Sequence, residues 1–293
     1  MILKRIALWC LVFCPPLFAQ KPVPLLIGVD TLVQHLQDRD LVLLHVGPKS
    51  EYPTKHIAGA RLVTFDDISL PMDHSNPTIL MLELPPPDVL RTKLANLGVS
   101  DNSYVVVYFD TDQSFSMATR VLFTLQYIGL GDHTSFLNGG MAEWIKAGHP
   151  VSAAPPIITP GKLSARPTAN IVADAELVRT VAQHPNYKLV YARAPVFYTG
   201  TDATYKKNGH IPGAVNIPFT DVADDSGKVD LKRITQDFQT AGIKPGDTVV
   251  AYCHIGQQAT AVILGARLLG NPVMLYDGAF QDWAINNRGA VEK

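Results

Sequence analysis

Apolar and polar positions in the second half of the chain alternate between two spacings. Short apolar runs of strand length are separated by longer stretches in which apolar residues recur at helical spacing. The predicted strands are 188–192, 248–252 and 273–276. The predicted helices are 231–241, 258–269 and 279–286, and a further helix that Asp174 caps and that runs through Leu177, Val178 and Val181. Short buried strands that alternate with helices predict an α/β fold, in which a mostly parallel sheet carries helices on both faces.

The same motifs occur twice along the chain, in the same order and at similar spacing. Residues 43–48 match 189–194, 55–60 match 209–214, 105–110 match 248–253, and 138–144 match 277–283. Such a pattern indicates a duplicated domain rather than a solenoid of small repeats. In this alignment, Asp110 of the first half stands at the position of Cys253 in the second half.

The predicted organisation has four segments. Residues 1–20 form a signal peptide, 21–151 an N-terminal domain, 152–167 a linker and 168–293 a C-terminal domain. The linker region is rich in Pro and Ala, which predicts an extended segment. The roughly 270 residues beyond the signal peptide suit two domains that each bury a core of their own.

The N-terminus predicts export. Lys4 and Arg5 form a basic region, residues 6–13 form an apolar region, and Ala19 and Gln20 mark the cleavage site. The apolar run is too short to cross a bilayer, and no later stretch is long and apolar enough to do so. We therefore expect an exported protein, periplasmic or secreted, without a membrane span. A lipid anchor at Cys14 would require a small residue where the chain has Phe13.

Composition and charge exclude several classes of partner. The formal net charge is −1, and charges of both signs are mixed along the chain. No basic stripe predicts binding to nucleic acid or to an anionic membrane surface. No motif predicts a metal site or an organic cofactor.

Cys253 is the candidate nucleophile. Cys10 and Cys14 lie in the predicted signal peptide, so Cys253 would be the one cysteine of the exported protein and would lack an intramolecular disulfide partner. It follows an apolar strand and precedes a loop that leads into a helix, and the carboxyl ends of parallel strands are where active sites collect. The loop residues are His254, Ile255, Gly256, Gln257, Gln258 and Ala259. Successive N–H groups of such a loop form an anion-binding nest that would stabilise a thiolate or a persulfide, and Gly256 allows the tight curl.

Three motifs together carry a family resemblance: Gly209 to Pro218 (GHIPGAVNIP), Tyr252-Cys253, and Asp277-Gly278 with Trp283. The chain resembles the tandem-domain rhodanese family of thiosulfate and 3-mercaptopyruvate sulfurtransferases. The resemblance implies two tandem rhodanese-like domains, of which the C-terminal one is catalytic. The N-terminal one would be inactive, because an aspartate at position 110 cannot carry a persulfide.

The resemblance also implies a reaction. A small donor of the thiosulfate or 3-mercaptopyruvate type would load sulfane sulfur onto Cys253, and a thiophilic acceptor such as cyanide, sulfite or a thiol would remove it. A protein thiol is a further candidate partner, and no cofactor is implied.

Departures from the family pattern leave the donor open. Thiosulfate enzymes have two basic residues after the cysteine, and mercaptopyruvate enzymes have small ones, whereas this loop has His254 and Ile255. The site therefore carries less positive charge than a thiosulfate enzyme. Arg193 is the nearest remaining cation, either as a substrate contact or in a structural ion pair. A substrate-binding Arg of some family members falls near Phe197.

Alternative interpretations remain for residues and for function. His254 is a general acid or base, an anion contact or an ordinary loop residue, whereas His56, His210, Trp144 and Trp283 recur in both halves and are interpreted as structural. The chain could instead be a non-turnover carrier or sensor of sulfane sulfur, or a partner-binding protein. A phosphatase or arsenate reductase of related fold would need Arg where the chain has Ala259.

Overall fold

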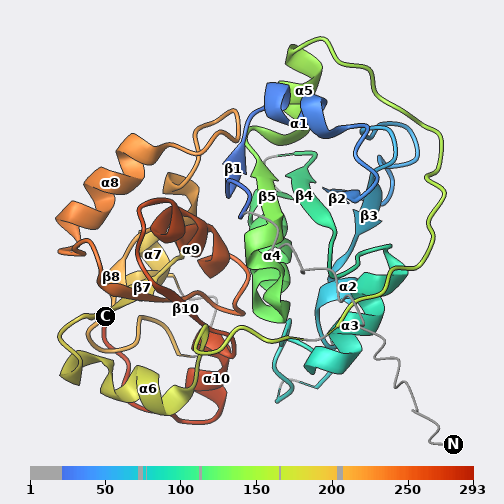
Figure 1. Cartoon of the computed structure of the whole chain (residues 1–293). Coiled ribbons are helices and arrows are strands. Elements are labelled where there is room, and N and C mark those ends of the chain that lie inside the picture. Colours follow the sequence, from blue (N-terminus) through green and yellow to red (C-terminus); the bar gives the residue numbers. More distant parts are fainter. Residues whose placement is uncertain (1–21, 72–74, 77, 112–113, 165, 203–206) are drawn as a thin grey trace, which may run out of the picture.

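The computed structural model describes residues 22–293 except 72–74, 77, 112–113, 165 and 203–206 (Figure 1). The predicted signal peptide, with Cys10 and Cys14, lies outside the described residues. Within the described part of the chain, no helix is long and apolar enough to cross a membrane.

The N-terminal half contains a five-stranded sheet of order β1-β5-β4-β2-β3, in which every pairing is parallel. Its strands are β1 (Leu26–Ile27), β2 (Leu41–Val46), β3 (Arg61–Val63), β4 (Tyr104–Phe109) and β5 (Thr134–Leu137). Its helices are α1 (Val29–His35), α2 (Phe65–Ile68), α3 (Pro87–Asn96), α4 (Phe115–Leu125), η2 (Gln126–Leu130), η3 (Gly131–His133) and α5 (Gly140–Lys146).

The C-terminal half repeats this plan with a parallel sheet of order β6-β10-β9-β7-β8. Its strands are β6 (Val172–Ala173), β7 (Tyr187–Tyr191), β8 (Val215–Asn216), β9 (Thr248–Tyr252) and β10 (Val273–Tyr276). Its helices are α6 (Ala175–Thr180), η4 (Val181–Gln183), α7 (Pro195–Tyr198), η5 (Phe219–Asp221), α8 (Leu231–Thr240), α9 (Ala259–Leu268) and α10 (Ala279–Ile285). The predicted α/β class with two tandem domains is confirmed.

Strand alternation decides which side of the sheet each residue of β9 faces. Val249, Ala251 and Cys253 share one apolar core with α8 and α9, whereas Val250 and Tyr252 join the core on the other face with α6 and α10. The core that contains Cys253 continues into the N-terminal half, because α9 packs against α4. Cys253 therefore belongs to the face of the sheet that is turned toward the domain interface.

Pairing in the two sheets corrects one prediction. His45 of β2 is opposite Tyr108 in the first sheet, and Tyr191 of β7 is opposite Tyr252 in the second. Tyr108 and Tyr252 each accept a hydrogen bond from a turn isoleucine N–H, at 3.0 and 2.8 Å. The two tyrosines are therefore equivalent, and the residue equivalent to Cys253 is Phe109 rather than Asp110. The prediction for Asp110 was wrong by one position, because two similar apolar strands can be aligned in more than one way from sequence.

Other residues that recur in both halves make matching structural contacts. The indole N–H of Trp144 donates to the Pro150 carbonyl at 2.9 Å, and that of Trp283 donates to the Ala290 carbonyl at 2.8 Å. His56 and His210 are buried, and each stacks on a tyrosine ring. Each therefore ties a turn to its neighbourhood.

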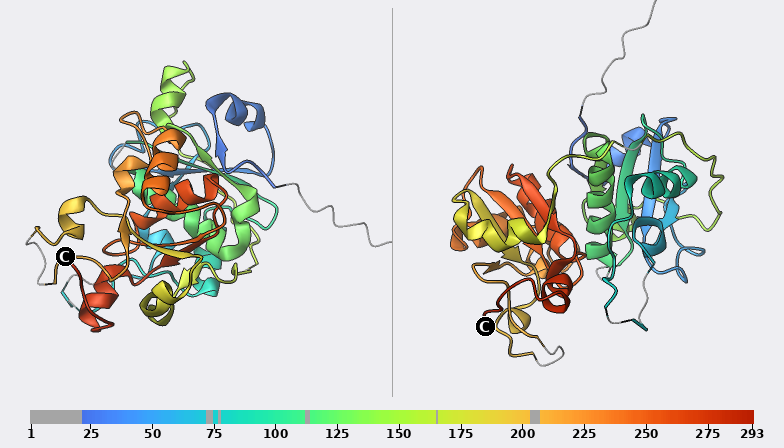
Figure 2. Two further views of the ribbon diagram at one scale, coloured as in Figure 1. Left: turned by 90° about the vertical axis from the view of Figure 1, so that its left-hand side faces the viewer. Right: turned by 90° about the horizontal axis from the view of Figure 1, so that it is seen from below.

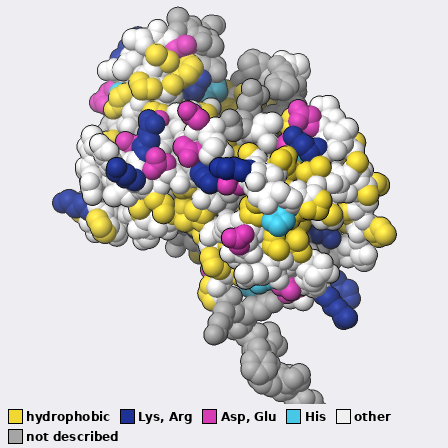
Figure 3. All heavy atoms as spheres, turned by 90° about the horizontal axis from the view of Figure 1, so that it is seen from above, with side chains coloured by type: hydrophobic (Ala, Val, Ile, Leu, Met, Phe, Trp, Pro, Cys, Tyr) yellow, Lys and Arg dark blue, Asp and Glu magenta, His cyan; other side chains and the backbone are white. Residues whose placement is uncertain are grey.

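The segment between the domains follows the outer side of the N-terminal half before it reaches α6 (Figures 1 and 2). Ser152 pairs with His56, and Gly161 N–H donates to the Ala95 carbonyl at 2.7 Å. The two halves meet at α4 and α9, where the hydroxyls of Thr119 and Thr260 lie 2.8 Å apart. On the face seen in Figure 3, acidic and basic side chains are interspersed rather than gathered by sign.

Candidate active site

Cys253 lies directly after β9 and is 1% exposed. Its thiol is free, and no other cysteine lies within the described residues. The backbone carbonyls of Cys253 and His254 accept hydrogen bonds from Phe280 and Gln281 at the start of α10, at 3.1 and 3.0 Å. The first part of the loop is thus fixed to the helix that follows β10.

Three further carbonyls of the loop, those of residues 256–258, also have donors. The Gly256 carbonyl accepts from Arg120 Nη1 at 3.2 Å, and the Gln257 carbonyl accepts from the Thr260 hydroxyl at 2.6 Å. The Gln258 carbonyl accepts from the Ala261 N–H at 3.1 Å.

The backbone N–H groups of the loop, unlike these carbonyls, lack hydrogen-bond partners within the described residues. Within the described residues, the N–H groups of 255–258 have no hydrogen-bond acceptor. A loop in which most carbonyls have donors and the N–H groups have no acceptor presents the positive ends of its peptide dipoles to a ligand. The arrangement is suited to hold an anion beside Cys253.

Gly256 is the tightest point of the loop. Its φ angle is +78°, and a Cβ atom there would lie 2.8 Å from the Asp277 carbonyl oxygen and 3.0 Å from Arg120 Nη1. Both the left-handed backbone and the missing side chain are therefore required.

His254 is half-buried beside the cysteine. Burial, followed by the nearby charge of Arg193, lowers the pKa of His254 to about 4. The imidazole is therefore neutral at neutral pH and adds no positive charge to the loop.

Arg193 follows β7 and lies against an aromatic ring. Its guanidinium carbon is 3.3 Å from the centroid of Phe197, and its carbonyl accepts from Asn216 Nδ2 at 2.8 Å. The cation–π contact holds this side chain near α7.

Sequence reasoning missed Arg120, which α4 of the other half brings to the loop. Arg120 is 1% exposed, pairs with Asp277 Oδ1 at 2.7 Å and donates to the Leu82 carbonyl at 2.6 Å. The available signal was a single charge within the otherwise uncharged helix of residues 115–125. A buried charge requires a partner, but the sequence does not say that the partner lies in the other half.

The corresponding place in the N-terminal half has no nucleophile. Phe109 fills the position of Cys253 and packs edge-on against Phe115, with ring centroids 5.4 Å apart. The next residue, Asp110, has a fully buried side chain and pairs with Lys55 at 3.1 Å.

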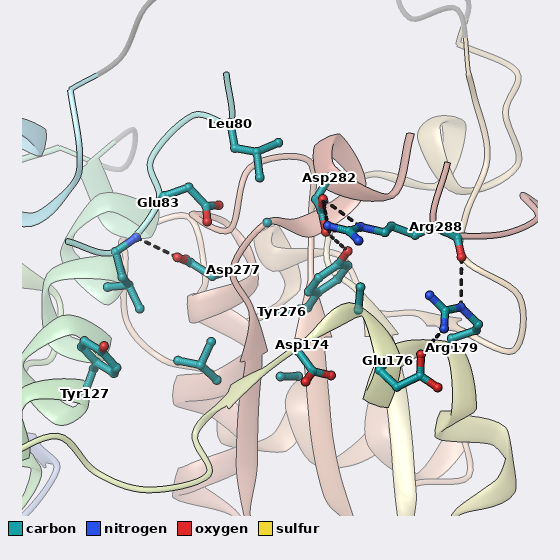
Figure 4. A pocket seen from close by; sticks show the side chains of 15 residues that line it. Leu80, Glu83, Tyr127, Asp174, Glu176, Arg179, Tyr276, Asp277, Asp282 and Arg288 are labelled. Carbon is teal, nitrogen blue, oxygen red and sulfur yellow. Dashed lines mark hydrogen bonds and ion pairs between the residues drawn. The ribbon is translucent and has the colours of Figure 1, made fainter. Parts of the chain in front are cut away.

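A pocket of about 580 Å³ lies between the halves, and Asp277 is one of the residues that line it (Figure 4). Asp277 Oδ2 accepts from the Leu84 N–H at 2.7 Å, and the carboxylate of Glu83 lies beside it. Burial, together with Asp277, raises the pKa of Glu83 to about 7. Among the described residues, no cluster of His, Cys, Asp and Glu is arranged to hold a metal ion.

The Rhodanese-like domain family matches residues 28–147 and 174–286 of this chain. The chain therefore belongs to the rhodanese family, with two such domains in tandem. It is 32% identical over 241 residues to the thiosulfate sulfurtransferase of Rattus norvegicus, which covers 80% of this chain and 79% of the relative. It is also 32% identical over 244 residues to the 3-mercaptopyruvate sulfurtransferase of Mus musculus, with the same coverage of 80% and 79%. These relatives define the chain as a sulfurtransferase.

Solved structures agree on the fold. The 3-mercaptopyruvate sulfotransferase SseA from Escherichia coli superimposes with a TM-score of 0.75 at 24% identity, covering 88% of this chain and 99% of that one. An EanB variant in complex with ergothioneine gives a TM-score of 0.78 at 21% identity, covering 92% of this chain and 70% of that one.

Proposed function

We propose that this protein transfers sulfane sulfur from a small donor to a thiophilic acceptor through a persulfide on Cys253. The observation that carries the proposal is the loop after Cys253. Its carbonyls at 254 and 256–258 have donors, while the N–H groups of 255–258 have no acceptor among the described residues. Such a loop stabilises negative charge on sulfur, both in the thiolate that attacks and in the persulfide that results.

The reaction consists of two displacements. In the first, the Cys253 thiolate attacks the outer sulfur of the donor, and the electrons of the broken bond leave with sulfite or with the enolate of pyruvate, which then takes a proton. In the second, the acceptor nucleophile attacks the outer sulfur of Cys253–S–S⁻, and the electrons of the sulfur–sulfur bond return to the cysteine. No net oxidation or reduction of the protein occurs over the cycle, and the two half-reactions give ping-pong kinetics.

The charges around the loop favour a donor that carries little negative charge. His254 is neutral because its pKa lies near 4, and Arg193 packs on Phe197. Arg120 is already paired with Asp277. A thiosulfate dianion would therefore gain less electrostatic binding energy here than in a site with two free cations. Among the small donors, this favours 3-mercaptopyruvate, which is a monoanion.

The test is intact mass spectrometry of the wild type and of Cys253→Ser after incubation with thiosulfate and, separately, with 3-mercaptopyruvate. We expect the wild type to gain one sulfur atom, to gain it faster from 3-mercaptopyruvate, and to lose it to cyanide. A gain of the same mass in Cys253→Ser would place the sulfur elsewhere. No gain from either donor would overturn transfer from these small donors and favour a protein-fed carrier of sulfane sulfur.

A further inference from the structure

The two halves present equivalent elements to the domain interface, so that a contact made by one half can be compared with its counterpart in the other. α4 and α9 begin at Phe115 and Ala259, each seven residues after its equivalent tyrosine, so that Arg120 corresponds to Leu264. The residues after β5 and β10 correspond in the same way, because Phe136 pairs with Val107 and Leu275 pairs with Ala251. Asn138 is therefore the counterpart of Asp277.

These counterparts make the same contact across the interface. Asn138 Oδ1 accepts from the Val229 N–H of the C-terminal half at 2.9 Å, as Asp277 Oδ2 accepts from the Leu84 N–H of the N-terminal half at 2.7 Å. A carboxamide is therefore sufficient to make this contact between the halves. Beside the Cys253 loop, the two equivalent positions carry the charged residues Asp277 and Arg120. On the side of the interface where Phe109 lies, the same positions carry the uncharged residues Asn138 and Leu264.

Docking alone does not explain this asymmetry. Arg120 and Asp277 are 1% and 7% exposed, and a buried ion pair adds little net stability because both charges lose their hydration. The pair has a second consequence, because Arg120 Nη1 also donates to the Gly256 carbonyl at 3.2 Å. On the same helix, the Ser116 hydroxyl accepts from Gln257 Nε2 at 2.9 Å.

We propose that Arg120 of the N-terminal half is a positioning residue for the Cys253 loop, which it reaches across the domain interface. Gly256 has no side chain to restrict its neighbouring peptides, and a rotated 256–257 peptide would turn a carbonyl rather than an N–H toward a sulfur anion. Arg120 prevents this rotation by holding the Gly256 carbonyl, while Asp277 holds Arg120. The N-terminal domain thus serves the reaction although Phe109 stands at its position equivalent to Cys253. This inference rests on the proposed persulfide chemistry of Cys253.

The test copies the silent side of the interface onto the active side with Arg120→Leu combined with Asp277→Asn. We expect the double variant to unfold in urea near the wild-type midpoint, because Leu264 and Asn138 already occupy the equivalent positions in the other half of the interface. We expect its rate constant for persulfide loading to fall at least tenfold, with a smaller change in donor KM. Arg120→Lys retains the charge but not the forked geometry, so its loading rate constant should lie between those of the wild type and the double variant.

Thr124→Val is the matched control, because it changes another buried polar residue of α4 whose hydroxyl has no hydrogen-bond partner among the described residues. It should load sulfur at the wild-type rate. A folded double variant that loads as fast as the wild type would overturn the positioning role, as would an equal loss in Thr124→Val. The alkylation rate of Cys253 by iodoacetamide is measured in parallel. If the wild type loads no sulfur, the proposed function fails, and a tenfold slower alkylation in the double variant would still support the positioning role.

Discussion

Gly256 shows how a single residue can carry two requirements at once. Its backbone is left-handed, with φ at +78°, and its missing Cβ leaves room for the Asp277 carbonyl oxygen. Gly270, at the other end of α9, has a similar φ of +82° but open space where a Cβ would be. A substitution at Gly270 therefore introduces backbone strain alone, whereas one at Gly256 introduces backbone strain and crowding of the loop.

We predict that Gly270→Ala lowers the free energy of unfolding by about 1–2 kcal/mol and leaves persulfide loading unchanged, because only backbone strain is introduced. Gly256→Ala should cost the same strain and also slow loading at least tenfold, because the new methyl group displaces Asp277 or Arg120. Urea unfolding and intact mass spectrometry measure the two effects. Equal loading rates in the two variants would contradict the crowding argument.

At the scale of elements, both sheets contain the same hydrogen bond between a strand tyrosine and a connecting turn. The hydroxyl of a buried strand tyrosine accepts the N–H of an isoleucine from an earlier connection of the same domain. Tyr108 accepts from Ile57, between β2 and β3, and Tyr252 accepts from Ile211, between β7 and β8. The environments differ, because the Tyr108 hydroxyl also lies 3.0 Å from His45 Nδ1. Because Tyr252 precedes Cys253, this bond also fixes the end of β9 from which the active loop begins.

We predict that Tyr252→Phe lowers the free energy of unfolding by about 1–3 kcal/mol, because the buried Ile211 N–H loses its acceptor. Tyr108→Phe is the matched substitution in the other half and should cost a similar amount, since it deprives both the Ile57 N–H and His45 of a partner. Loading of Cys253 should persist in both variants below the unfolding transition. A neutral effect of Tyr252→Phe would mean that the Ile211 N–H finds another acceptor.

At the scale of the whole molecule, the two domains share one apolar core and enclose acidic groups where they meet. Glu83 reaches this interface from the segment that precedes α3 and lies beside Asp277 (Figure 4). Burial, then the charge of Asp277, raises its pKa from 4.5 to about 7, against an opposing effect of Arg120. The folded protein therefore retains this proton to a higher pH than the unfolded chain does.

The sign of the pH effect follows from this difference. The protonated Glu83 makes its whole contribution to the free energy of unfolding below the pKa of the unfolded chain. This contribution disappears as the pH rises through about 7 and is absent at higher pH. We predict that Glu83→Gln is more stable than the wild type by about 1–2 kcal/mol at pH 8.5 and equally stable at pH 4, since part of the side chain remains solvated. Glu176→Gln, on the exposed rim of the same pocket, should show no such change. Urea unfolding at the two pH values is the measurement, and an equal pH dependence in wild type and Glu83→Gln would contradict the prediction.

The sequence by itself determined the elements and the candidate nucleophile. Strands β9 and β10 have the predicted bounds, and α8, α9 and α10 end within one residue of the prediction. These segments have a clear apolar period. Helix α6 likewise begins at the predicted Asp174 cap, whose side chain accepts from the Leu177 N–H at 2.8 Å. The two-residue strands β6 and β8 were missed, because so short a segment has no period to read.

Only the tertiary structure decided the register between the halves and the partners across the interface. Phe109 rather than Asp110 matches Cys253, which strand pairing and the Tyr108 hydroxyl bond reveal but a run of similar apolar residues does not. Arg120 is far from Cys253 in sequence, and its effect on Gly256 depends on how α4 packs against α9. Local propensity and periodicity act over a few residues, whereas the satisfaction of a buried charge depends on every segment that the fold brings beside it.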